Sequence, residues 1–229
     1  MNPTPLTIDI VSDVVCPWCI IGYKRLERAL DRLDHRFQVE LRWHPFELNP
    51  QMPTGGQNLR EHIMQKYGTT AEDSIAARKK LTALGAEVGF AFNFHDEMRM
   101  VNTFKAHQLL YWAAGSAAQT RLKLTLFEAY FNHRENIDET EVLVAAVERA
   151  GLDPVEARRV IADERNGIAV RQAESVWLQR GINAVPAYIF NHATLVSGAQ
   201  DTERFVALLS SPELESSAGR IKQRRAATA

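Results

Sequence analysis

Two cysteines, Cys16 and Cys19, lie at the junction between a strand-like and a helix-like stretch of the chain. Residues 6–11 alternate and are rich in β-branched side chains, which predicts a half-buried strand. From residue 17 onward apolar side chains recur at helical spacing, namely Ile20, Ile21, Leu26, Leu30 and Leu33. Residues 37–43 alternate again, so this part of the sequence predicts a β-α-β unit with parallel strands.

The spacing of the two cysteines suits thiol chemistry at the start of that helix. Pro17 fits a first helical turn, because its fixed φ and missing N–H cost nothing there. Cys16 therefore lies at a helix N-terminus, where free backbone N–H groups and the helix dipole favour a thiolate. Such positions lower a cysteine pKa from about 8.5 to about 3.5–7.5, and we expect this for Cys16. Cys19, one turn on, could then resolve a mixed disulfide formed at Cys16.

Three alternative roles for the cysteine pair are weaker. A structural disulfide between Cys16 and Cys19 would close a very short loop and remove little entropy from the unfolded chain. A zinc site needs two further ligands, yet the chain has no other cysteine and no two histidines spaced as zinc ligands. A chance pair of inert thiols is the third alternative, and the position between a strand and a helix argues against it.

The remainder of the chain is helical in pattern and then returns to strands. Residues 59–180 show helical periodicity with several breaks, and helix starts are expected at Asp138, with Glu141, and at Asp153, followed by proline. Two strand-like segments follow, 187–190 and 194–196, joined by a three-residue turn, and then a last helix through residues 205–209. The order of elements is thus β-α-β, a long helical stretch, and α-β-β-α.

This order predicts an α/β fold, namely a thioredoxin fold interrupted by a large all-helical insertion. We expect residues 1–58 to form its N-terminal part, residues 59–165 the insertion, residues 166–215 its C-terminal part and residues 216–229 a flexible tail. The chain has 229 residues, 45% of them hydrophobic, which is enough to build such a core without disulfides.

Charge and hydropathy exclude several classes of partner. The chain has 27 lysine and arginine residues and 28 acidic residues. Its net charge of −1 therefore creates no overall positive potential that would attract nucleic acid or anionic lipid. No window reaches the roughly 18 apolar residues of a membrane-spanning helix. The N-terminus lacks a basic start and an apolar stretch, so we expect a cytoplasmic protein, although a chain whose signal peptide had been removed would look the same.

Five segments of the chain form a recognisable set. They are DVVCPWC (13–19) with Ile21-Gly22, WHPFELNP (43–50), NTFKAH (102–107), GINAVPA (181–187) and SGAQ (197–200). Together they resemble the DsbA-like thioredoxin-fold family, specifically its FrnE-like branch. The likeness extends over residues 5–210. It implies a thioredoxin fold with a helical insertion, a nucleophilic Cys16, a resolving Cys19 and a cis-proline at Pro186 that faces them.

The resemblance also implies a substrate-binding surface beside the thiols. The Val185 backbone would pair with an extended substrate segment, next to Pro186. Pro17 and Trp18 belong to the same surface, and we expect a partly exposed Trp18 to contact partners, unless it only covers the helix end. The simpler alternative for Pro186 is a trans proline that opens a strand.

Four further residues attract weaker hypotheses. His44 follows the second strand and could tune a thiol, although a hydrogen-bonded structural histidine accounts for it better. Asn102 and Thr103 could line the site, but capping of the next helix suffices to account for them. His107, among apolar helical neighbours, is better assigned to core packing.

We therefore predict a thiol-disulfide oxidoreductase that acts on protein or low-molecular-weight disulfides, with no bound cofactor or metal. Glutathione or another thiol would be its redox partner, isomerase activity is open, and the protein would be a monomer or homodimer. One alternative is a glutathione-dependent isomerase or transferase of the kappa or hydroxychromene-carboxylate isomerase type, in which serine usually stands where this chain has Cys16. Another is a chaperone-like binding module, which would not need either thiol.

Overall fold

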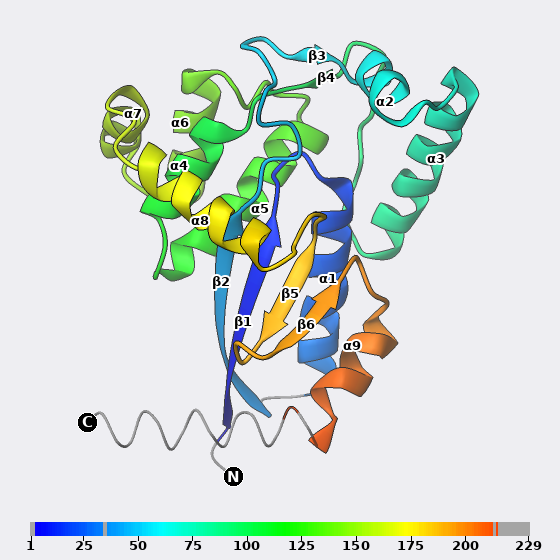
Figure 1. Cartoon of the computed structure of the whole chain (residues 1–229), viewed down its shortest axis with the longest axis vertical. Helices are drawn as coiled ribbons and strands as arrows, with labels where there is room; N and C mark the ends of the chain where they lie inside the picture. Colours follow the sequence, from blue (N-terminus) through cyan, green and yellow to red (C-terminus); the bar gives the residue numbers. More distant parts are fainter. Residues whose placement is uncertain (1–2, 34–35, 213, 215–229) are drawn as a thin grey trace.

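A mixed four-stranded sheet forms the centre of the molecule (Figure 1). We analysed a computed structural model, which describes residues 3–33, 36–212 and 214, so the predicted tail lies outside the described residues. The strands are β1 (Thr4–Ser12), β2 (Phe37–Pro45), β5 (Ala187–Phe190) and β6 (Thr194–Ser197), in the order β2-β1-β5-β6. β2 is parallel to β1, whereas β5 is antiparallel to β1 and β6 to β5. This arrangement confirms the predicted thioredoxin fold.

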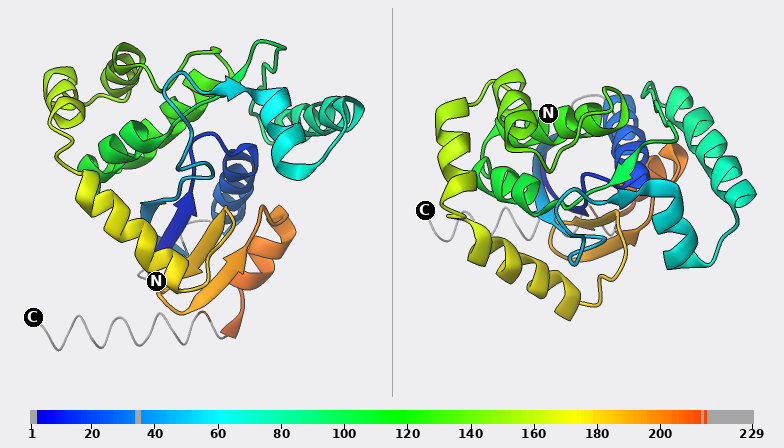
Figure 2. Two further views of the ribbon diagram at one scale, coloured as in Figure 1. Left: turned by 45° about the horizontal axis from the view of Figure 1, so that its top comes forward. Right: turned by 90° about the horizontal axis from the view of Figure 1, so that it is seen from above.

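Helices cover both faces of the sheet, which explains why β1 is buried on both of its sides. Ile8 and Ile10 pack into the main core with helix α1 (Pro17–Arg32), which also contacts α9 (Thr202–Leu209). Val11 belongs to a second apolar cluster with Trp177 of α8 (Gly167–Gln179), on the opposite face. Figures 1 and 2 show α8 on one side of the sheet and α1 on the other.

A glycine permits the close packing of α1 on the sheet. A Cβ atom at Gly22 would overlap the Tyr188 hydroxyl of β5 and press against Ala199. Gly22 lies within the motif that carries the family resemblance, and the structure gives it a packing role.

The insertion leaves the sheet after β2 and contains two groups of helices. Its helices are α2 (Leu59–Tyr67), α3 (Ala71–Glu87), α4 (Phe104–Trp112), α5 (Ala117–Phe131), α6 (Thr140–Arg149) and α7 (Pro154–Ala162). In both figures α2 and α3 lie to one side of the N-terminal end of α1, and α4 to α7 lie to the other (Figures 1 and 2). None of the helices in the described residues is long and apolar enough to cross a membrane.

The prediction of an all-helical insertion was wrong in one respect. Strand β4 (Arg99–Met100) lies within it and pairs antiparallel with β3 (Gln57–Asn58), which precedes α2. Strands of two residues are too short to show an alternating pattern, and their partners are distant in the sequence. Only the folded chain brings them together.

The two predicted helix starts had different outcomes. Asp153 is confirmed as a cap, because its side chain accepts hydrogen bonds from the backbone N–H groups of Val155 and Glu156. Asp138 does not start a helix, since α6 begins two residues later at Thr140. Its carboxylate instead accepts hydrogen bonds from the Lys105 ammonium and a backbone N–H of the 53–56 loop.

Candidate active site

The two cysteines lie at the end of β1 and the start of α1. Cys16 is the N-cap residue of α1 and Pro17 is its first residue, as predicted. Both thiols are free and buried, with 4% of Cys16 and none of Cys19 exposed. Trp18, between them, is 38% exposed, which agrees with the expected partly exposed side chain. Cys16 is therefore the thiol nearer to the surface.

The Val185–Pro186 peptide bond is cis and lies beside the first thiol. The Cys16 Sγ is 3.7 Å from the Val185 carbonyl oxygen. The Pro186 carbonyl accepts a hydrogen bond of 2.8 Å from the Gly198 backbone N–H, which anchors the segment to the chain that follows β6. The cis isomer implied by the resemblance is thus present, and the pairing of Val185 with a substrate remains a prediction.

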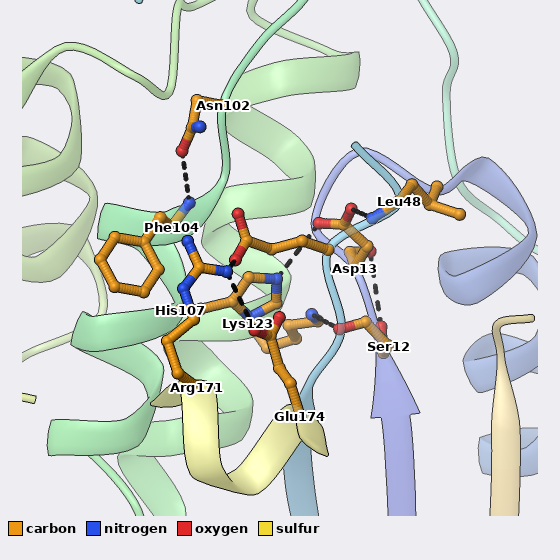
Figure 3. Close-up of polar contacts among 10 residues, drawn as sticks. Ser12, Asp13, Leu48, Asn102, Phe104, His107, Lys123, Arg171 and Glu174 are labelled. Atoms are coloured by element: carbon orange, nitrogen blue, oxygen red, sulfur yellow. Dashed lines mark hydrogen bonds and ion pairs between the residues drawn. The ribbon is translucent and has the colours of Figure 1, made fainter. Parts of the chain in front are cut away.

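A lysine from the insertion is buried at the end of β1, close enough to the thiols to interact with their charge. Lys123 of α5 is fully buried, and its Nζ donates a hydrogen bond of 3.2 Å to the Ser12 carbonyl (Figure 3). The ammonium group also lies over the rings of Trp43 and Phe127, at 5.4 and 5.2 Å from their centroids. Burial lowers the pKa of Lys123 to about 8, although the neighbouring thiols and Asp13 favour its charged form.

An aspartate and a histidine form a second buried contact beside this lysine. The Asp13 Oδ1 is 3.2 Å from the His107 Nε2, and the Asp13 Oδ2 accepts a hydrogen bond from the Leu48 backbone N–H (Figure 3). Burial opposes ionisation of Asp13, but the contacts with His107 and Leu48 and the charge of Lys123 leave its pKa below the ordinary value. His107 is buried, as predicted from the sequence. The prediction of simple core packing did not include its polar partner, Asp13.

The ionisation of the thiol pair differs from the sequence expectation. Burial opposes ionisation of Cys19, but a hydrogen bond from Cys16, the charge of Lys123 and a contact with Ser12 lower the pKa of Cys19. The hydrogen bond to Cys19 and burial raise the pKa of Cys16. The lowered pKa expected at Cys16 is therefore corrected: the hydrogen bond between the two thiols and the charge of Lys123 favour the thiolate at Cys19 instead.

Two carboxylates share one arginine beside this centre. Arg171 of α8 contacts the Glu47 carboxylate. The Glu174 Oε2 is 3.1 Å from the Arg171 Nη1 (Figure 3). The Arg171 guanidinium stacks over the Phe104 ring at 4.0 Å. The Glu47 side chain is only 1% exposed. Burial and the neighbouring Glu174 charge raise the pKa of Glu47 to about 8, despite the opposing effect of Arg171.

This raised pKa predicts a pH-dependent stability. Above its ordinary value of 4.5, Glu47 loses a proton in the unfolded chain but retains it in the folded protein until about pH 8. The free energy of unfolding should therefore fall as the pH rises through this window. Glutamine does not titrate, so Glu47→Gln lacks this pH-dependent loss of stability. Between pH 5 and 8 the free energy of unfolding of the variant should rise relative to that of wild type, by on the order of 1 kcal/mol or more. Urea unfolding at several pH values measures the difference, and a constant difference would contradict the assignment.

His44 lies away from the thiols. Its Nε2 is 2.8 Å from the Asp9 Oδ1, and its ring packs against Trp177 at an interplanar angle of 60°, with centroids 4.7 Å apart. His192 contacts the other oxygen of Asp9 at 3.0 Å. The hypothesis that His44 tunes a thiol has no contact to support it, and the structural role accounts for the residue.

Asn102 and Thr103 serve the local fold. The Asn102 Oδ1 accepts a hydrogen bond of 2.9 Å from the Phe104 backbone N–H at the start of α4, and its Nδ2 donates to the Met52 carbonyl. Thr103 occupies the N-cap position but makes no side-chain capping hydrogen bond. Neither residue lines the cavity at the thiols, so the capping role is confirmed for Asn102 and fails for Thr103.

A cavity of about 630 Å³ opens beside Cys16, between the thioredoxin fold and helices α2 and α3. It is lined by Cys16, Pro17 and Trp18, by Ala184 and Val185 of the cis-proline segment, and by residues of the insertion. Its basic lining residues, His62, Lys66 and Arg78, were not identified from the sequence. They lie on helices with mixed exposed faces, where nothing in the sequence distinguishes them from surface residues.

Lys123 was also missed, although the sequence contained a signal for it. Within α5 many of the buried positions recur at intervals of three and four, among them 119, 122, 123, 126, 127 and 130. Lys123 is the charged residue on this face, and a buried lysine needs a specific partner. For metal binding, no group of three or more potential ligands is present within the described part of the chain.

Comparison with known proteins assigns the family. The model of the DSBA-like thioredoxin domain matches residues 7–210. The chain belongs to the DsbA-like thioredoxin family. The uncharacterised protein YwbO from Bacillus subtilis is 26% identical over 199 residues, which cover 86% of this chain and 92% of YwbO.

Solved structures agree with this DsbA-like assignment. A probable DsbA oxidoreductase from Streptomyces coelicolor superimposes with a TM-score of 0.84 and 33% identity, over 90% of this chain and 88% of that one. The cytosolic disulfide reductase DsbM from Pseudomonas aeruginosa has a TM-score of 0.56 and 15% identity, over 95% and 98%. A 2-hydroxychromene-2-carboxylate isomerase has a TM-score of 0.63 and 16% identity, over 97% and 99%. The last two share the fold.

Proposed function

We propose that the protein is a thiol-disulfide oxidoreductase in which Cys16 and Cys19 are the redox pair. The observation that carries this proposal is the position of two free thiols at the start of α1, with Cys16 lining a cavity and Cys19 within the electrostatic influence of the buried Lys123. A structural pair would need neither the cavity nor the cation. DsbA-like relatives and the fold of DsbM are consistent with this activity.

The chemistry consists of two exchange steps. The Cys16 thiolate attacks one sulfur of a substrate disulfide, a mixed disulfide forms at Cys16, and the other substrate sulfur leaves as a thiolate. The departing substrate thiolate takes up the Cys19 proton, and the Cys19 thiolate, favoured by the charge of Lys123, then attacks the Cys16 sulfur and releases the second substrate thiolate. The substrate gains two electrons and the protein becomes a disulfide. Reduction by glutathione or another thiol reverses these steps and completes the cycle.

The thiol–thiolate hydrogen bond reconciles the lower pKa of Cys19 with attack by Cys16. The Cys16 S–H donates to the Cys19 sulfur, so transfer of that proton moves the negative charge to Cys16 without removing it from the pair. Cys16 is the sulfur that lines the cavity, so a substrate meets it first. The pair therefore keeps its charge in the interior until a disulfide approaches.

The same fold also occurs in an isomerase, so the chemistry rests on the residues of this chain. The cysteine at position 16 and the second thiol behind it favour redox exchange over glutathione-dependent isomerisation. The FrnE-like branch, a glutathione partner and a cytoplasmic location belong to this proposal; DsbM, described as cytosolic and also solved with glutathione, is consistent with them. A monomer or homodimer is expected.

A redox titration tests the proposal. We would equilibrate the protein with glutathione buffers of known ratio and count free thiols by alkylation, with Cys16→Ser and Cys19→Ser as controls. A single two-electron transition that either substitution abolishes is the expected result. A midpoint potential above the cytosolic glutathione potential of about −240 mV would identify a protein that accepts electrons. A midpoint below it would identify one that donates them. Thiols that stay inert to oxidised glutathione would refute redox exchange, and binding retained by the double variant would then favour a chaperone-like module.

A further inference from the structure

The cavity beside Cys16 combines an apolar wall with basic side chains. Its apolar lining comes from several elements, including Phe46, Leu59, Ile63, Leu81, Phe94 and Phe131. A volume of about 630 Å³ is in the range of pockets that enclose small organic ligands. A flat docking surface for a protein substrate would not need so deep an apolar wall.

The charged lining of this cavity is predominantly positive. Lys66 and Arg78 carry positive charges, and the Lys66 Nζ is hydrogen-bonded to two neutral acceptors, the Leu48 carbonyl and the Asn49 side chain. The acidic lining residue is Glu47, whose raised pKa of about 8 keeps it largely protonated at neutral pH. The chain as a whole carries a net charge of −1, so the positive lining is a local feature of the cavity.

Arg78 has unused hydrogen-bonding capacity. Its side chain is 14% exposed, and its Nη1 donates a long hydrogen bond of 3.4 Å to the His95 carbonyl. The nearest carboxylate, Asp96, is 3.9 Å away, largely exposed and in contact with Arg60. The Arg78 Nη2 is buried, and no hydrogen-bond partner for it is present among the described residues. A buried donor without a partner is costly, and an anionic ligand would supply one.

We propose that this cavity binds small disulfides and thiols whose substituent is apolar and carries a carboxylate, and that Arg78 binds the carboxylate. This inference rests on the proposed redox function and specifies its substrate class. The apolar wall would hold the substituent while its sulfur lies at Cys16, and the carboxylate would point toward α3. Cys16 would form the mixed disulfide, one substrate thiolate would leave, and Cys19 would release the other, as in the two exchange steps above.

The reduced protein provides a direct test with two matched disulfides. One is dithiobis(nitrobenzoate), an aromatic disulfide with carboxylates, and the other is its bis-amide, which has the same rings without charge. We would measure the rate of thiol release by each from wild type, Arg78→Gln and Arg78→Lys. Arg78→Gln should slow the reaction of the carboxylate about tenfold and that of the amide less than about twofold, and Arg78→Lys should restore part of the loss.

A control variant separates local binding from overall charge. Arg28→Gln removes one positive charge from an exposed position of α1 that does not line the cavity, and it should leave both rates unchanged. In wild type, nitrobenzoate should inhibit the reaction competitively and nitrobenzamide should not, a readout that does not depend on folding of the Arg78 variants. Equal slowing of both disulfides by Arg78→Gln, or equal inhibition by both compounds, would overturn the inference. A wild-type protein that neither disulfide oxidises would instead refute the redox function.

Discussion

Replacement of Lys123 by methionine should raise the first pKa of the thiol pair by about 1 to 3 units. A nearby opposite charge lowers a pKa by about this amount, and the substitution removes that charge. The fully buried ammonium donates to the Ser12 carbonyl, and its charge stabilises the thiolate at Cys19. The thiolate population at neutral pH would fall about tenfold per unit, while the more basic thiolate becomes a better nucleophile. The net loss in reaction rate with a small disulfide should be about 3- to 30-fold.

The rate of alkylation by iodoacetamide as a function of pH measures this effect. Methionine keeps most of the lysine volume, but Ser12 loses a hydrogen-bond donor and Asp13 a nearby positive charge, so urea unfolding must first show that the variant is folded. Lys80→Met, on the exposed face of α3, provides the control and should leave the pH profile unchanged. An unchanged profile in Lys123→Met would show that the buried cation does not act on the thiols.

Truncation of Phe131 to alanine should reduce the free energy of unfolding by about 3 to 5 kcal/mol, the cost of deleting a large buried aromatic side chain. Phe131 is 2% exposed and contacts five other aromatic rings of the insertion, namely Phe90, Phe92, Phe94, Phe127 and Tyr130. Their edge-to-face and stacked geometries add to the area that they bury. This cluster connects α5 to the segment that follows α3.

Urea unfolding monitored by circular dichroism tests this prediction. Phe131→Leu retains most of the buried volume and should lose clearly less stability than the alanine variant. Tyr67→Ala removes an aromatic side chain that is 59% exposed, and should change stability by about 0.5 kcal/mol or less. A loss below about 1 kcal/mol in Phe131→Ala would mean that the cluster is not part of the cooperative core.

The sequence by itself determined the elements whose pattern is local. The alternation of residues 6–11 and 37–43, the helical spacing after Pro17 and the strand pair near the C-terminus are each confirmed as strands and helices. The position of Cys16 at a helix N-terminus follows from the same local reasoning, because a strand, a turn and a proline define where the helix begins. The family resemblance added the cis peptide bond at Pro186, which the structure shows.

Only the tertiary structure decided the electrostatics of the site. Helix position alone predicted a lowered pKa at Cys16. In the folded protein the pKa is lowered at Cys19, by the hydrogen bond from Cys16 and by the charge of Lys123, which belongs to a helix more than a hundred residues away in sequence. The contact of Asp13 with His107, and of Glu47 with Arg171, likewise joins distant segments. Sequence periodicity reports which face of an element is buried. It does not report which buried charges meet, because that depends on how the insertion packs against the sheet.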